Sequence, residues 1–459
     1  MTAGHSISTS QKISLLIKEL AQEVARLSQT VNEPRGPQSD LAKNLESQLE
    51  VAAKVRGRAL YYPYIGTGAG RGPYVELEDG SVKLDLINGI GIHLFGHSHP
   101  RLLEAAIRGS LSDIVNQGNL QPNKEYIKLA QRLVQLASKK SRLRHVWITT
   151  SGSRANENAL KISRQKKSPA RMVLAMDRAF AGRTTMMAEI TDNPEYREGL
   201  PNYNEVLRVP FYDSKNPRSA EDSLRILKEH VARHEGNISA FMFEPVQGEG
   251  GFRVGPREYF IPMLEFCKQK GIAIWLDEVQ TFGRTGELFA FEALDLGKYV
   301  DLVTVAKILQ VGATLYTEEY NPKPGLIAGT FAGTSAALSV GLEILDMLEN
   351  DGYFGADGKV AKIHNSVVSM LNELNETTCK GLLRDAGGLG LMVAVTPLDG
   401  SKDKVNNLLK IMFKNGIVAF SCGRDPYRMR FLLPAVLTDA DIKVAKGIIE
   451  KSVLEAAKG

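Results

Sequence analysis

Residues 277–307 read DEVQTFGRTGELFAFEALDLGKYVDLVTVAK, and a short apolar run leads into each end of this segment. The run IAIWL precedes Asp277, and the run LVTVA precedes Lys307. Near-continuous apolar runs of this length are typical of strands that are covered on both faces, as in a parallel α/β sheet. Because ligands bind beyond the carboxyl ends of such strands, the pattern predicts that Asp277 points into a ligand crevice.

Other segments extend this prediction along the chain. Three further runs of the same kind alternate with helical patterns: HVWIT (145–149), RMVLAM (171–176) and ISAFMF (238–243). The last third predicts a smaller α+β lobe. Its expected helices are 337–350, 358–377 and 403–416, and its expected strands are 390–397 and 428–434. Two N-terminal helices are expected at about 10–31 and 41–55, where packing or a dimer contact is favoured over regulation.

Composition excludes several classes of protein. With 459 residues, 43% of them hydrophobic, the chain has enough material for two or three lobes with a large core. Its 57 basic and 52 acidic residues are interspersed and leave a net charge of +5, which favours small anionic ligands over nucleic acid. The three cysteines lie far apart without metal-ligand spacing, so we expect no disulfide, no metal and a cytoplasmic location. No apolar stretch is long enough to span a bilayer, so no membrane partner is expected.

Two further stretches contain candidate site residues. Ser151, Gly152 and Ser153 stand where a predicted strand meets a helix, and a helix N-terminus offers N–H groups and a positive dipole end to a phosphate. An ordinary serine N-cap explains the same residues. The stretch EPVQGEGGF at 244–252 places two glutamates in a loop, which a simple glycine-rich turn explains equally well.

The lysine and the carboxylate also have plain explanations when each is taken singly. Asp277 would serve as a helix cap, and Lys307 as a strand-end lysine that extends to water. A desolvated lysine, however, has a lowered pKa, and its neutral amine can form a Schiff base. A phosphate cup, a strand-end carboxylate and an apolar lysine together are what pyridoxal phosphate needs. We therefore expect pyridoxal 5'-phosphate as the cofactor.

Residues 277–307 resemble the signature of the class III (omega) aminotransferases, pyridoxal-phosphate enzymes of fold type I. The resemblance runs from about residue 60 almost to the end of the chain. Further matching motifs follow in family order: DLINGIGIHLFGHSHPRLLEA, SGSRANENALKISR, AFAGRTTMM, EPVQGEGG, GTFAGTSAALSVGLEIL and RMRFLLPAVLTDADI. The resemblance implies an α/β fold in which a large domain has a mostly parallel central sheet sandwiched by helices, beside a smaller α+β domain.

The expected division of the chain has four segments. An N-terminal helical extension covers 1–57, and 58–112 contributes to the small domain. The large cofactor-binding domain covers 113–340, and the C-terminal small α+β domain covers 341–459.

The resemblance also implies roles around the cofactor ring. Lys307 would form the internal aldimine and then move protons between substrate and cofactor. Asp277 would keep the pyridinium nitrogen protonated, Gln280 would hydrogen-bond the phenolic oxygen, and Phe180 would stack on the ring.

By the same resemblance, Ser151, Gly152 and Ser153 would hold the phosphate. Thr330 matches a threonine that in this family reaches the phosphate of the neighbouring subunit. This implies a homodimer with shared active sites, and pairing of dimers into a tetramer stays open.

The substrate side of the resemblance involves four residues. Arg430 matches the arginine for an α-carboxylate and Arg183 the one for a distal carboxylate, as a transaminase using 2-oxoglutarate requires. Glu249 matches the glutamate that pairs with the first arginine when an omega-amine occupies the site. Ile90 stands where ornithine aminotransferases have a tyrosine, which makes ornithine a less favoured donor.

Some positions depart from the family pattern. Arg154 replaces a usual glutamate, Thr334 and Ser335 replace a usual Asn-Pro, and ILQVGATLYT replaces a glycine-rich stretch after the lysine. These changes leave the donor, its stereochemistry and the pathway open.

The favoured function is amino transfer from 4-aminobutyrate, acetylornithine or a diamine-like compound to 2-oxoglutarate, giving glutamate and an aldehyde. The alternatives are an aminomutase or decarboxylating transaminase on the same scaffold, and a non-catalytic binding protein.

Overall fold

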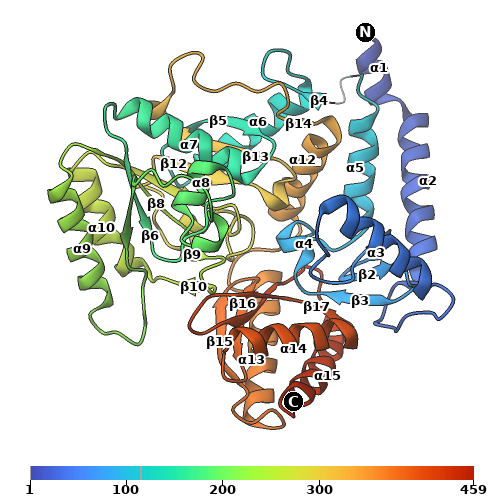
Figure 1. The fold of residues 1–459 in the computed structure, drawn as a ribbon. Coiled ribbons are helices and arrows are strands. Elements are labelled where there is room, and N and C mark those ends of the chain that lie inside the picture. Colours follow the sequence, from blue (N-terminus) through green and yellow to red (C-terminus); the bar gives the residue numbers. More distant parts are fainter. Residues whose placement is uncertain (1, 114–115, 459) are drawn as a thin grey trace. The chain divides into compact units, whose positions relative to one another are not determined.

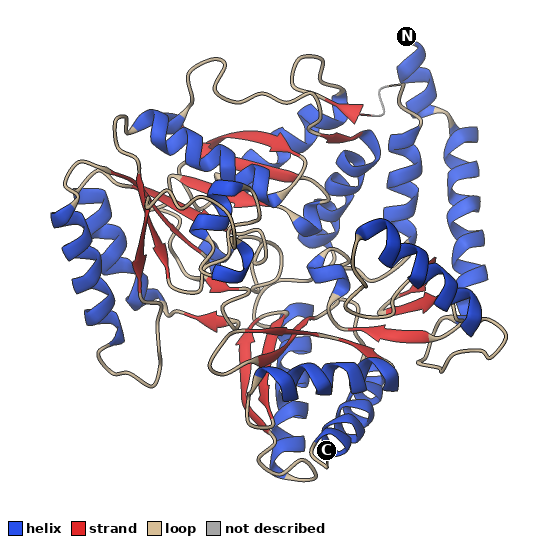
Figure 2. Cartoon of the chain, viewed as in Figure 1, coloured by secondary structure: helices blue, strands red, loops and turns tan. Residues whose placement is uncertain are grey.

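The computed structural model describes residues 2–113 and 116–458, and the chain divides into two compact units (Figure 1). Unit 1 consists of Met1–Glu104 and Asp357–Gly459, and unit 2 of Ala105–Ala356. Both units contain helices and strands (Figure 2). The expected domain boundaries after residues 112 and 340 both fall inside unit 2.

The central sheet of unit 2 confirms the predicted α/β fold. Its strands lie in the order β5-β13-β12-β11-β8-β6-β7. Their bounds are β5 Leu143–Thr149, β13 Gly312–Thr317, β12 Leu302–Val305, β11 Ala273–Asp277, β8 Ile238–Phe243, β6 Met172–Met176 and β7 Val206–Val209. Strands β12, β11, β8, β6 and β7 run in parallel, whereas β13 is antiparallel to both β12 and β5. The carboxyl ends of the five parallel strands therefore meet at one end of the sheet.

Helices cover this sheet (Figure 1). Their bounds are α6 Lys124–Ala137, α7 Gly152–Lys166, α8 Thr185–Ile190, α9 Ser219–Arg233, α10 Arg257–Gln269, α11 Ala290–Ala293 and α12 Ser335–Asn350. Helix α7 packs on β12 and β13, and α10 packs on β11. Every residue of β6, β8 and β11 is buried, which explains the near-continuous apolar runs in the sequence.

Two short antiparallel pairs complete unit 2. Strand β4 (Asn116–Gln117) pairs with β14 (Gly333–Thr334), and β9 (Val246–Gln247) pairs with β10 (Arg253–Val254).

Unit 1 contains two four-stranded sheets and their helices. One sheet has the order β1 (Gly66–Arg71), β2 (Tyr74–Leu77), β3 (Val82–Asp85), β17 (Ile417–Val418), and the other β15 (Leu383–Leu389), β16 (Met392–Pro397), β19 (Arg428–Leu432), β18 (Phe420–Cys422). The helices are α1 Ala3–Thr9, α2 Gln11–Leu27, α3 Ala42–Arg56, α4 Asn88–Gly91, α13 Lys359–Glu376, α14 Lys402–Asn415 and α15 Asp439–Ala456, and α5 (Pro100–Ser110) spans the boundary with unit 2.

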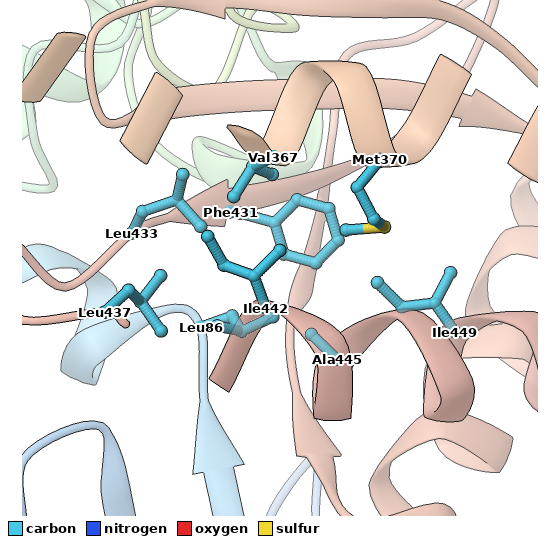
Figure 3. A pocket seen from close by; sticks show the side chains of 9 residues that line it. All are labelled: Leu86, Val367, Met370, Phe431, Leu433, Leu437, Ile442, Ala445 and Ile449. Atoms are coloured by element: carbon cyan, nitrogen blue, oxygen red, sulfur yellow. The ribbon is translucent and has the colours of Figure 1, made fainter. Parts of the chain in front are cut away.

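The core of unit 1 is closely packed around a small apolar cavity of about 10 Å³ (Figure 3). Helices α13 and α15 and strand β19 contribute most of its lining. The lining residues are Leu86, Val367, Met370, Phe431, Leu433, Leu437, Ile442, Ala445 and Ile449. A void of this size and polarity stays dry, so it belongs to the core packing and offers no ligand site.

The N-terminal helices belong to unit 1. Ser10 caps α2 by accepting a hydrogen bond from the Ile13 backbone N–H. Two residues of α2 are buried, Ile17 and Ala21, and they form part of its apolar face. In the parts of the chain that the structure describes, no helix has both the length and the apolar character needed to cross a membrane.

Candidate active site

Asp277 ends β11 and is buried at the carboxyl end of the parallel strands. Its Oδ1 accepts a hydrogen bond from the Val279 backbone N–H at 2.8 Å, and its Oδ2 accepts one from Asn156 Nδ2 at 2.7 Å. Burial raises the pKa of Asp277 to about 6, although these hydrogen bonds and the charge of Lys307 favour the ionised form. The carboxyl group is therefore fixed in orientation and changes charge close to neutral pH.

Lys307 directly follows Ala306 at the end of the strand next to β11. In the paired register Asp277 faces Thr304, three residues before the lysine. Lys307 has a left-handed φ of +53°, which costs about 1 kcal/mol or more in a residue with a Cβ atom. The structure brings the predicted lysine and carboxylate to adjoining strand ends, where the lysine charge acts on the pKa of Asp277.

The N-terminus of α7 lies against the segment that follows β11. Ser151 caps the helix, because its Oγ accepts a hydrogen bond from the Arg154 backbone N–H at 3.4 Å. A Cβ atom at Gly152 would lie only 2.8 Å from Val279 Cγ1, so glycine permits this close approach. Ser153 is half-buried and Arg154 is exposed. The start of this 15-residue helix offers an anion N–H groups and a positive dipole end close to Asp277.

Gln280 is buried three residues after Asp277. Its backbone carbonyl oxygen accepts a hydrogen bond from Arg284 Nη1 at 2.8 Å. A Cβ atom at Gly248 would lie 2.5 Å from Gln280 Nε2, so glycine there leaves room for the amide. Among the described residues, neither Gln280 Oε1 nor Asn156 Oδ1 has a hydrogen-bond partner. Buried polar atoms are normally paired, so these amides fit a polar ligand beside Asp277.

Phe180 lies half-buried in the loop after β6. Its backbone N–H donates to Glu244 Oε1 at 3.0 Å, and Glu244 Oε2 accepts from the Gly248 backbone N–H at 2.9 Å. Sequence reasoning missed Asn156, and it singled out the stretch 244–252 without a specific role for Glu244. Their partners Phe180 and Asp277 stand 64 and 121 positions away in the chain, so no local pattern could have revealed these contacts.

Arg183 is exposed beside the same loop. Its guanidinium carbon lies 3.4 Å from the ring centroid of Tyr196 and 5.9 Å from that of Phe180. Stacking on an aromatic face holds a guanidinium in place while its N–H groups stay available for a carboxylate. Glu249 is partly buried, and its charge helps raise the pKa of Glu244.

The other two expected substrate residues belong to unit 1. Arg430 is buried on β19, where it pairs in register with Ala394 and Phe420. Ile90 lies in α4 with a left-handed φ of +63°. The substrate roles of Arg430 and Ile90 stay predictions.

Thr330 is exposed three residues before β14. Gly118 comes so close to it that a Cβ atom there would overlap the Thr330 carbonyl oxygen. A hydrogen bond from the Asn119 backbone N–H to the Gly329 carbonyl oxygen joins the two loops at 3.3 Å. The role of Thr330 in a neighbouring subunit stays a prediction.

The chain is similar to known proteins over most of its length. Residues 61–453 match the family model described as aminotransferase class-III. The chain is 31% identical to an acetylornithine aminotransferase from Methanocaldococcus jannaschii over 85% of this chain and 93% of that enzyme. It is 29% identical to a probable 4-aminobutyrate aminotransferase from Bacillus subtilis, over 81% and 89%. A crystal structure of a Bacillus anthracis aminotransferase superposes with a TM-score of 0.81 at 23% identity, covering 90% of this chain and 99% of that one.

Proposed function

Since the chain belongs to the class-III aminotransferase family, we propose that it transfers an amino group from an omega-amino donor to 2-oxoglutarate, giving glutamate and an aldehyde. Enzymes of this family depend on pyridoxal phosphate, which when bound supplies an electron sink for charge that develops on a substrate carbon. The observation that carries the proposal is the meeting of Asp277 and Lys307 at adjoining strand ends.

In this proposal Asp277 holds a proton on the ring nitrogen of the cofactor through its negative charge. Asn156 and Val279 fix the two oxygens of Asp277, so that the charge stays in one place. Lys307 serves as the acceptor and donor of the proton at the reacting carbon. Gln280 donates a side-chain amide N–H to the phenolic oxygen, and its burial three residues after Asp277 supports this fit.

The proposal also assigns the remaining cofactor contacts. Ser151, Gly152 and Ser153 hold the phosphate at the start of α7, and Phe180 covers the ring.

The choice of donor is supported by the relatives, which are named for acetylornithine and 4-aminobutyrate. Both compounds carry an amine that is remote from one carboxylate, so the site has to accept two substrate shapes. Arg183 binds the distal carboxylate, Arg430 binds the α-carboxylate of 2-oxoglutarate, and Glu249 pairs with Arg430 when the omega-amine is bound.

A homodimer with shared active sites and a cytoplasmic location are further parts of the proposal. Leu120 is 97% exposed and Phe331 is 60% exposed, next to the bonded pair Asn119 and Gly329. Apolar side chains so exposed favour burial by a second copy, whose site Thr330 then completes. The three cysteines are free and buried, which suits a reducing compartment.

The test is the visible absorption spectrum of the protein loaded with pyridoxal phosphate. We expect a yellow band that fades on addition of 4-aminobutyrate or acetylornithine and returns with 2-oxoglutarate. The Lys307→Ala variant, measured beside it, should lack this cycle. Release of carbon dioxide, or a band that ignores every amine tested, would contradict the proposal.

A further inference from the structure

Glu244 directly follows β8, and β8 lies beside β11 in the sheet. Phe243 and Leu276 are register partners in this parallel pair, so Glu244 and Asp277 come next on neighbouring strands. Each of the two residues is 5% exposed. Two carboxyl groups are therefore buried side by side at the carboxyl end of the sheet, and the proposed function uses only one of them.

The two carboxyl oxygens of Glu244 accept hydrogen bonds from backbone N–H groups of two different loops. Oε1 accepts from the Phe180 N–H at 3.0 Å, and Oε2 accepts from the Gly248 N–H at 2.9 Å. A second link joins the same loops, since Gln247 Nε2 donates to the Asp177 carbonyl oxygen at 2.5 Å. Glu244 thus connects the loop after β6 to the turn after β9.

Each of the two loops carries or contacts a residue of the proposed cofactor site. One carries Phe180, which is expected to cover the ring face. The other carries Gly248, which lies against the amide of Gln280. A displacement of either loop changes the position of a group that contacts the ring.

We propose that Glu244 is a positioning residue of the cofactor site, which holds Phe180 and Gln280 in place through two backbone hydrogen bonds beside Asp277. This inference rests on the proposed assignment of the cofactor residues. Its role is indirect, because Glu244 acts through the loops and through its neighbouring carboxylate.

The electrostatics around Glu244 agree with this arrangement. Burial, followed by the charge of Asp277, raises the pKa of Glu244 to about 8, and Glu249 on the same loop acts in the same direction. The pKa of Asp277 is raised less, to about 6. Two negative charges buried side by side are costly, so an ionised Asp277 disfavours ionisation of Glu244.

The experiment compares Glu244→Gln with a matched control, Glu189→Gln. Glu189 is also buried in unit 2, and it accepts two backbone hydrogen bonds, from Tyr203 and Glu205, each at 2.9 Å. In both variants the amide nitrogen meets one of the two N–H donors, so each loses a hydrogen bond of the same type. The control removes this bond away from Asp277.

Cofactor-free protein is titrated with pyridoxal phosphate, and tryptophan fluorescence and visible circular dichroism are recorded. We expect Glu244→Gln to weaken cofactor binding about tenfold and to reduce the dichroism of the bound cofactor by more than half, because the ring loses its fixed orientation. Glu189→Gln should keep native values for both. Thermal unfolding of the two cofactor-free variants should shift by a similar amount.

Native affinity and dichroism in Glu244→Gln would overturn the inference, and so would an equal loss in Glu189→Gln. The Lys307→Ala variant separates this result from failure of the proposed function. If the cofactor band is the same in native protein and Lys307→Ala, the site assignment itself is wrong. If Lys307→Ala loses the band while Glu244→Gln behaves as native, only the positioning role is wrong.

Discussion

At the residue scale, the candidate site contains two residues whose folded conformation or environment is energetically unfavourable. Asp277 is a buried acid with a raised pKa, and Lys307 has a left-handed backbone. Neither state favours folding, so each is retained by the surrounding structure. The sequence identified both residues through the apolar runs before them, but it contained no sign of their strain or of their hydrogen-bond partners.

The raised pKa of Asp277 predicts a specific effect of pH on stability. Between its ordinary value of 3.8 and about 6, the folded state binds a proton at this site that the unfolded state has released. The contribution of Asp277 to stability is therefore lost as the pH rises through this window, by an amount on the order of 1–3 kcal/mol. Asp277→Asn cannot ionise, so the difference in melting temperature between variant and native protein should grow in favour of the variant from pH 4 to pH 7.

This measurement uses cofactor-free protein, because the bound cofactor would stabilise the ionised form of Asp277. Loss of the Asp277 charge also makes ionisation of Glu244 less costly, which acts in the same direction. A difference in melting temperature that stays constant with pH would contradict a raised pKa at Asp277.

Ile90 offers a second test at this scale. It has φ +63° and ψ +45° and is 37% exposed, and a β-branched residue is strained in this region. Asparagine tolerates the left-handed conformation, so Ile90→Asn should increase the free energy of unfolding by about 1 kcal/mol. Ile92→Asn provides the control, since Ile92 is similarly exposed but has φ −91°. Thermal or urea unfolding should show a gain for Ile90→Asn alone, and an equal change in both variants would exclude strain as the cause.

At the scale of elements, the sequence predicted five of the seven strands of the central sheet. The five expected runs correspond to β5, β6, β8, β11 and β12. Strand β13 was missed because GATLYT has only a few large apolar residues and was treated as an atypical stretch after the lysine. Its antiparallel place between β5 and β12 depends on pairing between distant segments, which periodicity does not report.

Helix α12 also shows that periodicity does not report which unit of the chain an element belongs to. Its apolar periodicity predicted the helix, but the expected boundary after residue 340 divides it, whereas α12 packs on α6 within unit 2. The structure also explains one departure from the family pattern. Thr334 caps the helix by accepting from the Ala337 N–H at 3.0 Å, and Ser335 Oγ accepts from Asn123 Nδ2 at 2.9 Å. Threonine thus provides a cap in place of asparagine, and serine occupies the first turn, where proline is tolerated.

The close contact between the start of α7 and the segment after β11 can be tested with one substitution that creates a steric clash and a second that removes it. In Gly152→Ala the new methyl group would lie 2.8 Å and 3.0 Å from the two Cγ atoms of Val279. Overpacking of this kind costs about 1–3 kcal/mol, so we expect cofactor binding to weaken about tenfold or more. Val279→Ala removes both Cγ atoms and keeps the backbone N–H that binds Asp277. The double variant should therefore recover most of the lost affinity in a fluorescence titration, and a double variant as weak as Gly152→Ala would exclude this contact as the cause.

At the scale of the whole molecule, some features of the chain suit a second copy. Leu120 and Phe331 expose large apolar surfaces in unit 2, and in unit 1 helix α2 exposes Leu16, Leu20 and Leu27. The sequence led to the proposal of a dimer only through the resemblance of Thr330 to a family position, because a single chain contains no pairing pattern for a partner. Burial of these apolar residues would contribute to dimer stability in proportion to the area covered.

The proposal of shared active sites makes a prediction that an active site built from a single chain would not satisfy. Homodimers of Lys307→Ala should be inactive, and homodimers of Thr330→Ala should bind the cofactor weakly. In a mixed dimer that contains one copy of each variant, one site carries both substitutions and the other carries neither. If Thr330 serves the neighbouring site, the mixed dimer should regain about half of the native activity per dimer, with native cofactor affinity at one site. If Thr330 acts in its own chain, each site keeps one defect and activity stays at the level of the Thr330→Ala protein or below.

Differently tagged chains, refolded together and purified on both tags, give the mixed dimer for this measurement. The restored activity would arise from a site assembled from two chains, because neither variant chain contains all of its residues.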